Sequence, residues 1–189
     1  MLMGKEIVVV ALFTIFLIAA ILPRIIQKQK KVETVGCVGI NRKLFIFGKF
    51  SLFTSFALIL IRLFSGRLSL FEENDAFFWA CVGLLAVGVT FFTLAILRLG
   101  TFSLRVGLAQ ESTALRTTGI YRISRNPMLL GLYFIALGSG LYVQCPINWI
   151  LVIIALIVHH KIILAEEVFL QNRFGEEWIR YRKNVRRYL

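Results

Sequence analysis

The chain has 189 residues, of which 58% are hydrophobic and 17% charged, and its mean hydropathy of +0.79 is too high for a small soluble domain. Its 22 Lys and Arg outnumber its 10 Asp and Glu, which gives a net charge of +12. No groove-reading motif or aromatic-interleaved basic platform accompanies this excess, which argues against nucleic acid as a partner. The composition therefore indicates an integral membrane protein.

Three apolar stretches in the first half of the chain predict membrane-spanning helices. Residues 77–97 form the clearest one, because 21 uncharged positions give about 30 Å of helix, the hydrocarbon thickness of a bilayer. Residues 7–22 form a shorter stretch, but a helix that continues to Ile26, with the Arg24 side chain reaching the headgroups, would cross the membrane. A cleaved signal peptide is the alternative, and it lacks a basic n-region and a clear cleavage site. Residues 44–63 form the third stretch, interrupted by Lys49 near one end and Arg62 at the other, as expected of a helix whose ends reach the headgroups.

The last apolar stretch, residues 128–158, has 31 uncharged positions and is too long for one span. The middle of this stretch holds a polar cluster with a proline, which is typical of a tight turn: Gln144, Cys145, Pro146 and Asn148. We therefore expect a hairpin of two helices, about 16 and about 18 residues long. The predicted fold class is an all-α integral membrane protein with about five transmembrane helices. Three glycines of the fourth span are spaced for close helix contact: Gly131, Gly138 and Gly140.

The positions of the basic residues predict the orientation of these spans. Five spans place 19 of the 22 Lys and Arg on one side of the membrane and three on the other. By the positive-inside rule, the amino terminus lies outside and the carboxyl-terminal tail in the cytoplasm. The same rule, with attraction to anionic lipid, accounts for the basic cluster at residues 28–31. We expect a cell membrane in a prokaryote or the endoplasmic reticulum membrane in a eukaryote.

Two cytoplasmic segments remain. The connection 98–127 is long for a structureless loop and too apolar for a disordered tether, so we expect it to be functional. In the tail from Ala165, aromatic and apolar residues recur at intervals of four and three, which predicts an amphipathic helix lying on the inner leaflet. These residues are Phe174, Trp178, Tyr181, Val185 and Tyr188.

Glu166 and Glu167 follow the fifth span, where carboxylates are normally avoided, and ionisable groups near membrane depth indicate a functional site. Neutralisation by the neighbouring cation of Arg173 or Lys161 is the structural alternative. His159 and His160 precede them by two helical turns on a similar face. Two histidines without a Cys or Asp partner nearby do not predict a metal site, and the three cysteines, in separate segments, are interpreted as apolar fillers.

Several short motifs occur in a fixed order over roughly the last 85 residues. Leu115 is followed by T-T-G-I-Y, ending at Tyr121, and then by S-R-N-P-M with Asn126 and Pro127. After a hairpin come the Glu pair and the tail motif F-G-E-E-W with Tyr181 and Val185. This order resembles the isoprenylcysteine carboxyl methyltransferase family of membrane methyltransferases and its phospholipid methyltransferase-like relatives.

The resemblance implies transfer of a methyl group from S-adenosylmethionine, which enters from the cytosol, to a lipophilic acceptor from the bilayer, leaving S-adenosylhomocysteine. The carboxylate of a prenylated cysteine is the first expectation for the acceptor. A phospholipid or thiol methyltransferase of the same architecture, an NADPH-dependent membrane reductase and a non-enzymatic scaffold are the alternatives. By analogy, residues 1–97 hold three spans with a basic cytoplasmic loop, and residues 98–189 form the catalytic region.

The resemblance also implies site residues. The cofactor candidates are Leu115, Tyr121, Asn126, Pro127, Glu166 and Glu167, and the carboxylates would offset the positive charge of the sulfonium and ammonium groups. Glu167 and Arg173 are the catalytic candidates. Arg173 would hold an acceptor carboxylate through bidentate hydrogen bonds, with Arg125 as the second choice. The alternative for Arg173 is a structural ion pair with Glu166 or Glu177.

Overall fold

The computed structural model describes residues 4–29, 41–65, 75–99 and 115–189. Within them all the regular secondary structure is helical, as predicted. The elements are α1 (Glu6–Gln29), α2 (Arg42–Ser65), α3 (Asp75–Leu99), the short 3-10 helix η1 (Gly119–Arg122), α4 (Pro127–Val143), α5 (Pro146–Phe174) and α6 (Glu176–Asn184). Residues 100–114 of the long connection and the basic residues Lys30 and Lys31 lie outside the described residues.

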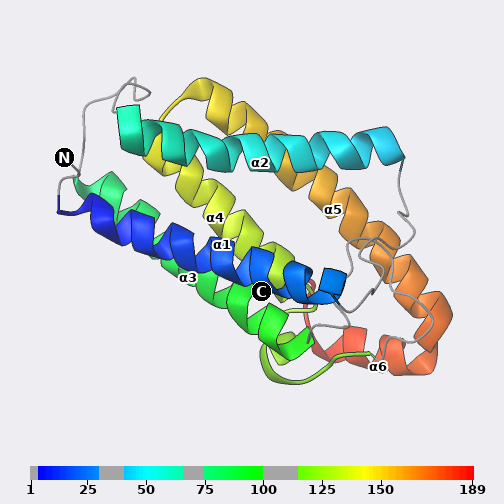
Figure 1. Ribbon diagram of the computed structural model, residues 1–189. Helices are drawn as coiled ribbons and strands as arrows, with labels where there is room; N and C mark the ends of the chain where they lie inside the picture. Colours follow the sequence, from blue (N-terminus) through cyan, green and yellow to red (C-terminus); the bar gives the residue numbers. More distant parts are fainter. Residues whose placement is uncertain (1–3, 30–40, 66–74, 100–114) are drawn as a thin grey trace.

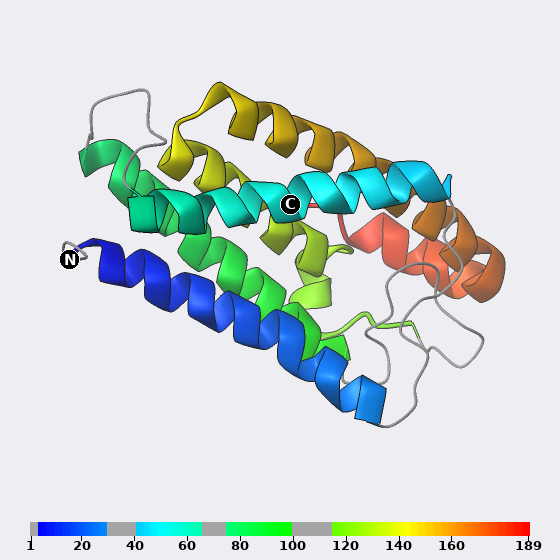
Figure 2. The same ribbon diagram turned by 45° about the horizontal axis from the view of Figure 1, so that its top comes forward.

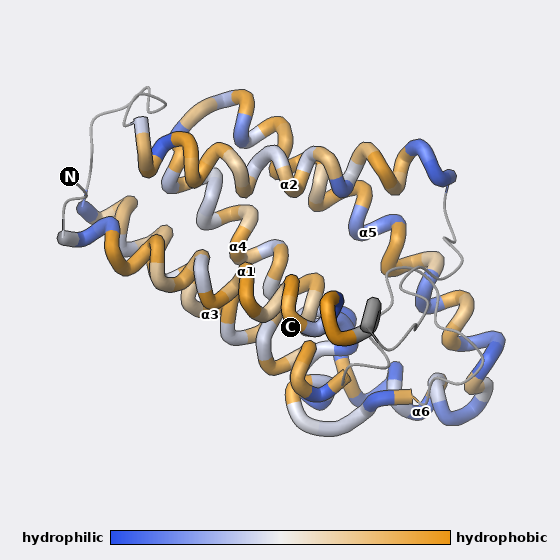
Figure 3. Tube along the Cα trace, in the orientation of Figure 1, coloured by the Kyte–Doolittle hydropathy of each residue, from blue (hydrophilic) through white to orange (hydrophobic). Residues whose placement is uncertain are grey.

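Helices α1 to α5 alternate in direction, so the bundle has two ends (Figures 1 and 2). One end carries the start of α1, the α4–α5 turn and the close of α2. The other end carries the close of α3 and α5, the start of α2 and α4, and α6. Four helices are long and apolar enough to cross a membrane, and α4, with 17 residues, is a shorter apolar helix. Hydrophilic residues gather at the end that carries α6 (Figure 3). The chain is thus a multi-pass membrane protein.

Helix α4 lies in the interior and packs against α3, α2 and α5, most extensively against α3. Small residues permit this contact: a Cβ on Gly131 would lie 2.6 Å from the Gly88 carbonyl oxygen, and one on Gly88 would lie 2.7 Å from that of Gly131. A Cβ on Gly138 would lie 3.1 Å from the Leu85 side chain, and one on Gly140 would lie 2.9 Å from the Trp149 ring. The predicted packing role of the α4 glycines is therefore confirmed.

The predicted hairpin turn is also confirmed. Gln144 ends α4 in the left-handed conformation with φ of 51°, and Pro146 begins α5, where its missing N–H costs nothing. Helix α5 is longer than the predicted 18 residues, because it continues past the apolar stretch to Phe174 and includes both glutamates. The glutamates therefore have fixed helical positions.

The tail differs from its prediction. Instead of one helix on the leaflet, the chain breaks at Gly175, whose φ of 49° favours glycine, and the short α6 follows. The apolar face of α6 turns inward, and Trp178 is only 2% exposed. Aromatic periodicity alone could not distinguish a face buried in lipid from one buried in protein.

Candidate functional site

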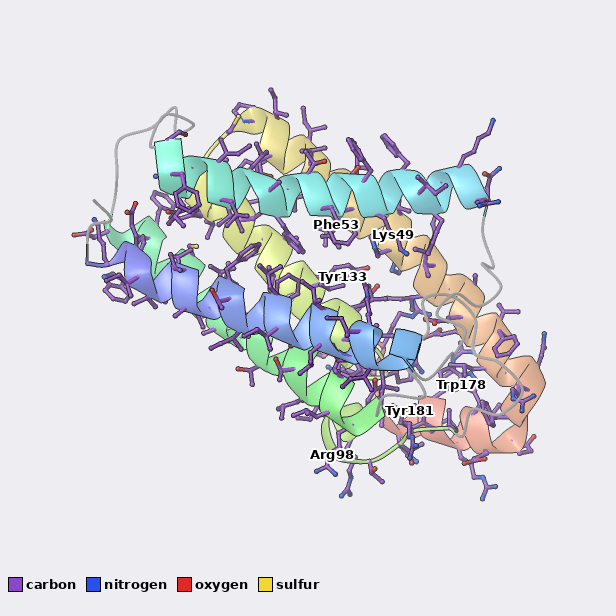
Figure 4. The ribbon with its side chains drawn as sticks, viewed as in Figure 1. Lys49, Phe53, Arg98, Tyr133, Trp178 and Tyr181 are labelled. Atoms are coloured by element: carbon purple, nitrogen blue, oxygen red, sulfur yellow. The ribbon has the colours of Figure 1, made fainter. Side chains whose placement is uncertain are left out.

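The connection before α4 approaches α6 through a buried hydrogen bond. Tyr121 is buried in η1, and its carbonyl oxygen accepts a 2.7 Å bond from the Tyr181 hydroxyl. Trp178 packs edge-on against Tyr181, with ring centroids 5.7 Å apart. Figure 4 shows both aromatic residues on the side of α6 toward the bundle. Burial raises the pKa of Tyr181 to about 12, so this hydroxyl remains a donor at neutral pH.

An ion-pair cluster joins three distant segments at this end of the bundle. Glu167 of α5 accepts a 2.9 Å bond from Arg125 Nη2, and it accepts bonds of 3.0 and 2.8 Å from Nε and Nη2 of Arg187. The side chains of Glu167 and Arg125 are 8% and 6% exposed. We call Arg125, Glu167 and Arg187 the arginine–glutamate cluster; one buried carboxylate here holds two cations.

Hydrogen bonds to two backbone carbonyl oxygens hold the C-terminal residues against the start of α4. The Arg125 N–H donates to the Arg186 carbonyl oxygen at 2.9 Å, and the Ser124 hydroxyl donates to that of Arg187 at 3.1 Å. The Asn126 side-chain amide donates to the same Arg187 oxygen at 3.3 Å. The tail is therefore a structural part of the site.

The two arginines of the cluster differ in their electrostatic environment. Burial lowers the pKa of Arg125, although the carboxylate of Glu167 opposes that effect. The hydrogen bonds to Glu167 raise the pKa of the more exposed Arg187. Both groups are charged at neutral pH, so the cluster carries one net positive charge.

Glu166 faces away from this cluster. Consecutive residues of an α-helix are separated by about 100°, and Glu166 lines a cavity of about 380 Å³ instead. His159, seven residues earlier, lines the same cavity, whereas His160 Nδ1 lies 2.6 Å from the Tyr188 hydroxyl in the tail. The predicted common face therefore holds for the pair His159 and Glu166, and a second face carries His160 and Glu167 toward the tail.

The cavity lies among α1, α2, α3, α4 and α5, and its wall is mostly aliphatic and aromatic. Four ionisable side chains interrupt this wall: Arg24, Lys49, His159 and Glu166. The apolar lining includes Phe16, Leu17, Leu52, Phe53, Phe56, Phe92, Leu129 and Leu132. A mostly apolar pocket with a few polar groups is typical of sites for lipophilic ligands.

The sequence-predicted residues divide between these two regions. Tyr121, Asn126 and Glu167 take part in the cluster and its surrounding hydrogen bonds, Pro127 is buried at the start of α4, and Leu115 is half-buried where the described chain resumes. Glu166 alone of the candidates lines the cavity.

The structure does not bring Arg173 to the site. Its side chain is exposed at the close of α5 with its guanidinium 5.7 Å from the Phe174 ring centroid. Neither it nor Arg125 lines the cavity. Of the two arginines considered for the acceptor, Arg125 contacts Glu167 and Arg173 does not reach the cavity.

Sequence reasoning missed three basic residues. Arg187 was counted among the tail charges, and no spacing indicates that the tail returns to Glu167. Lys49 and Arg24 were interpreted as helix-end residues that reach the headgroups. Their positions inside hydrophobic runs were the available signal for a functional role.

Two buried donors at the cluster have no hydrogen-bond acceptor among the described residues: Arg125 Nε and Trp178 Nε1. A buried unpaired donor costs about 1–3 kcal/mol, so a bound molecule with acceptor atoms would be stabilised here. The described residues contain no group of three or more His, Cys, Asp or Glu that could hold a metal ion.

Comparison with known proteins gives the family. The profile of the family described as phospholipid methyltransferase matches residues 76–177, which is more than half of the chain and includes α3, η1, α4 and α5. An uncharacterized protein of Haemophilus influenzae is 38% identical over 63 residues, covering 33% of this chain and 100% of that protein. No solved structure matches the chain. The chain belongs to the phospholipid methyltransferase family, a family of membrane methyltransferases.

Proposed function

We propose that the protein transfers a methyl group from S-adenosylmethionine to a lipophilic acceptor. The observation that carries this proposal is the placement of the two glutamates on α5. Glu167 belongs to the polar cluster, and Glu166 lines the apolar cavity. A cofactor bound at the cluster and an acceptor in the cavity would therefore meet beside one helix.

The chemistry of the cluster fits the cofactor. S-Adenosylmethionine supplies an electrophilic methyl group on a sulfonium, and its methionine carboxylate, ribose and adenine offer acceptor atoms. Arg125 Nε and Trp178 Nε1 are buried donors that lack acceptors among the described residues, and Asn126 and Tyr121 lie in the same hydrogen-bonded unit. Glu166, in no ion pair with a described residue, provides the negative charge that stabilises a sulfonium near a low-dielectric cavity.

The acceptor is proposed to occupy the cavity. A prenylated cysteine would attack the methyl carbon with a carboxylate oxygen; the new O–C bond forms as the C–S bond breaks, and its electron pair stays on sulfur. No base is needed, because the carboxylate is already ionised. Orientation of the two bound reactants can supply about 7–11 kcal/mol of the barrier.

A phospholipid amine is the second candidate, and the family match together with Glu166 favours it. Attack by an amine nitrogen needs the neutral amine, so one proton must leave. A carboxylate facing the cavity is a suitable proton acceptor. For a thiol acceptor the same requirement applies to the S–H proton.

The test is a binding and transfer assay on the purified full-length protein. Calorimetric titration with S-adenosylhomocysteine and with NADPH separates a methyltransferase from a reductase, and preference for NADPH would overturn the proposal. Transfer of a radiolabelled methyl group is then measured with a prenylcysteine analogue, phosphatidylethanolamine and a lipophilic thiol.

Glu166→Gln tests the role of the cavity carboxylate. We expect at least about a tenfold loss in kcat/KM, because a charge near the sulfonium or the acceptor proton is removed. Exposed Glu177→Gln on α6 is the matched control and should retain activity. Equal activity of Glu166→Gln and wild type would contradict a chemical role for Glu166.

A further inference from the structure

Lys49 is an ionisable residue well inside a hydrophobic helix. It lies about 10 Å along α2 from Arg42, at 1.5 Å per residue, and its side chain is half-buried. The ammonium is 4.3 Å from the centroid of the Phe45 ring. Lys49 and Phe53 lie one turn apart, and Figure 4 shows both on the same side of α2. A cation in such a span is costly, so its presence there indicates a functional site.

The charges that line the cavity do not balance. Arg24 of α1 and Lys49 of α2 carry two positive charges, and Glu166 is the single carboxylate among the lining residues. No ion pair among the described residues joins either cation to a carboxylate. His159 supplies no negative charge to the lining. Its Nδ1 carries a hydrogen, which it donates to the Ala155 carbonyl oxygen at 2.8 Å. The lining therefore has one surplus positive charge.

Both cations come from the part of the chain outside the family match. The match begins at residue 76, after α2 has ended, and it includes Arg125 and Glu167 of the arginine–glutamate cluster but not Arg187. Arg24 is exposed at the cavity, whereas Lys49 is further shielded among aromatic residues. The groups within the family match therefore lie at α4 and α5. Arg24 on α1 and Lys49 on α2 lie outside the match and are available to select the acceptor.

We infer that Lys49, with Arg24, binds an oxyanion on the lipophilic acceptor, so that the cavity selects anionic or zwitterionic lipids over neutral ones. The inference rests on the proposed function, because it takes the bound lipid to be the methyl acceptor. A carboxylate and a phosphodiester share the chemistry that two cations recognise, and Glu166 would face an ammonium group of a zwitterionic lipid. Lipophilic thiols and alcohols without an oxyanion bind weakly.

The experiment measures equilibrium binding to the full-length protein in a non-ionic detergent. One ligand pair is N-acetyl-S-farnesylcysteine and its uncharged methyl ester, and the other is lysophosphatidylethanolamine and the monoacylglycerol of the same chain. We expect about tenfold tighter binding of the charged member in at least one pair, the gain typical of a charge-assisted hydrogen bond. The pair that shows the preference identifies carboxylate or phosphate as the natural oxyanion.

Three variants assign the preference to Lys49. Lys49→Met, of similar length, should abolish the preference, and Lys49→Arg should keep most of it. Lys43→Met removes an exposed lysine from the first turn of the same helix and should change nothing. An equal affinity of wild type for charged and neutral members in both pairs would overturn the inference, as would a preference that survives in Lys49→Met.

S-Adenosylhomocysteine affinity separates this inference from the proposed function. Unchanged affinity in Lys49→Met demonstrates that the variant is folded and that its loss concerns the acceptor alone. A wild-type protein that prefers charged lipids but binds no S-adenosylhomocysteine would refute the proposed function and leave the oxyanion site supported.

Discussion

Glu166 and Glu167 are adjacent in the sequence, but the helical step directs them to different environments. Glu167 holds Arg125 and Arg187, and Glu166 lines the cavity. The sequence resemblance grouped both with the cofactor. In the structure, a substitution of Glu167 also breaks a buried ion-pair cluster, so its effect on cofactor binding includes the loss of the local fold.

Glu167→Gln should therefore destabilise the protein. The amide cannot neutralise Arg125, whose side chain is 6% exposed, and breaking a buried pair costs about 3–5 kcal/mol. Thermal unfolding in detergent should show a clear decrease in the midpoint and a loss of S-adenosylhomocysteine binding. Glu166→Gln should unfold near the wild-type temperature, and a midpoint unchanged in Glu167→Gln would contradict the structural role of the cluster.

The sequence predicted which residues of the motifs belong to the site, but it did not predict which residues they contact. Local resemblance identified Tyr121, Asn126 and Glu167, which do gather at one place. Arg173 was chosen because a guanidinium can hold an acceptor carboxylate through two hydrogen bonds, and its position in space could not be predicted. The chain breaks at Gly175, and Arg187, twenty residues from Glu167, binds that glutamate.

At the scale of helices, close contact between α3 and α4 positions the site. Gly88 and Gly131 allow the two backbones to approach, and α4 then presents Met128, Leu129 and Leu132 to the cavity. Spacing of small residues made this contact predictable in α4. The sequence pattern did not indicate that α3 is the helix these glycines contact, because that depends on the tertiary fold.

Gly131→Ala should weaken this packing. The new Cβ would lie 2.6 Å from two backbone atoms of α3, Gly88 O and Phe92 N, and neither can move alone. Overpacking of this kind costs about 1–3 kcal/mol, to be measured as a lower unfolding midpoint. Gly83→Ala is the control, because nothing lies within 4 Å of its Cβ position and alanine favours the helix. Equal midpoints for the two variants would contradict the close α3–α4 contact.

At the scale of the whole molecule, the alternation of five helices places both halves of the site at one end of the bundle. The α4 start, the α5 close and α6 meet there. Three ionisable groups of the cavity, Arg24, Lys49 and Glu166, lie in the halves of their helices nearest that end. At the other end, Lys5 binds Asp75 at 2.9 Å, which joins the start of α1 to the start of α3. The uneven distribution of Lys and Arg was sufficient to predict that the start of α4 and the close of α5 lie at the same end. Which segments share an end depends only on the number of crossings between them.

The orientation in the membrane is the last prediction. The basic end carries α6, so the positive-inside rule places it in the cytoplasm, where S-adenosylmethionine is available. Ser65 at the close of α2 and Lys183 in α6 are exposed at opposite ends. Each is replaced by cysteine in a variant whose three native cysteines are removed, and intact bacterial cells are treated with a membrane-impermeant maleimide.

Ser65→Cys should react in intact cells, and Lys183→Cys should react only after the cells are made permeable. The reverse pattern would place the site outside the cell, and a cofactor supplied by metabolism could not reach it. Reaction of both positions from the same side would contradict five crossings, because Ser65 and Lys183 are separated by α3, α4 and α5, an odd number of spans. The labelling pattern therefore tests the helix count and the direction of cofactor entry separately.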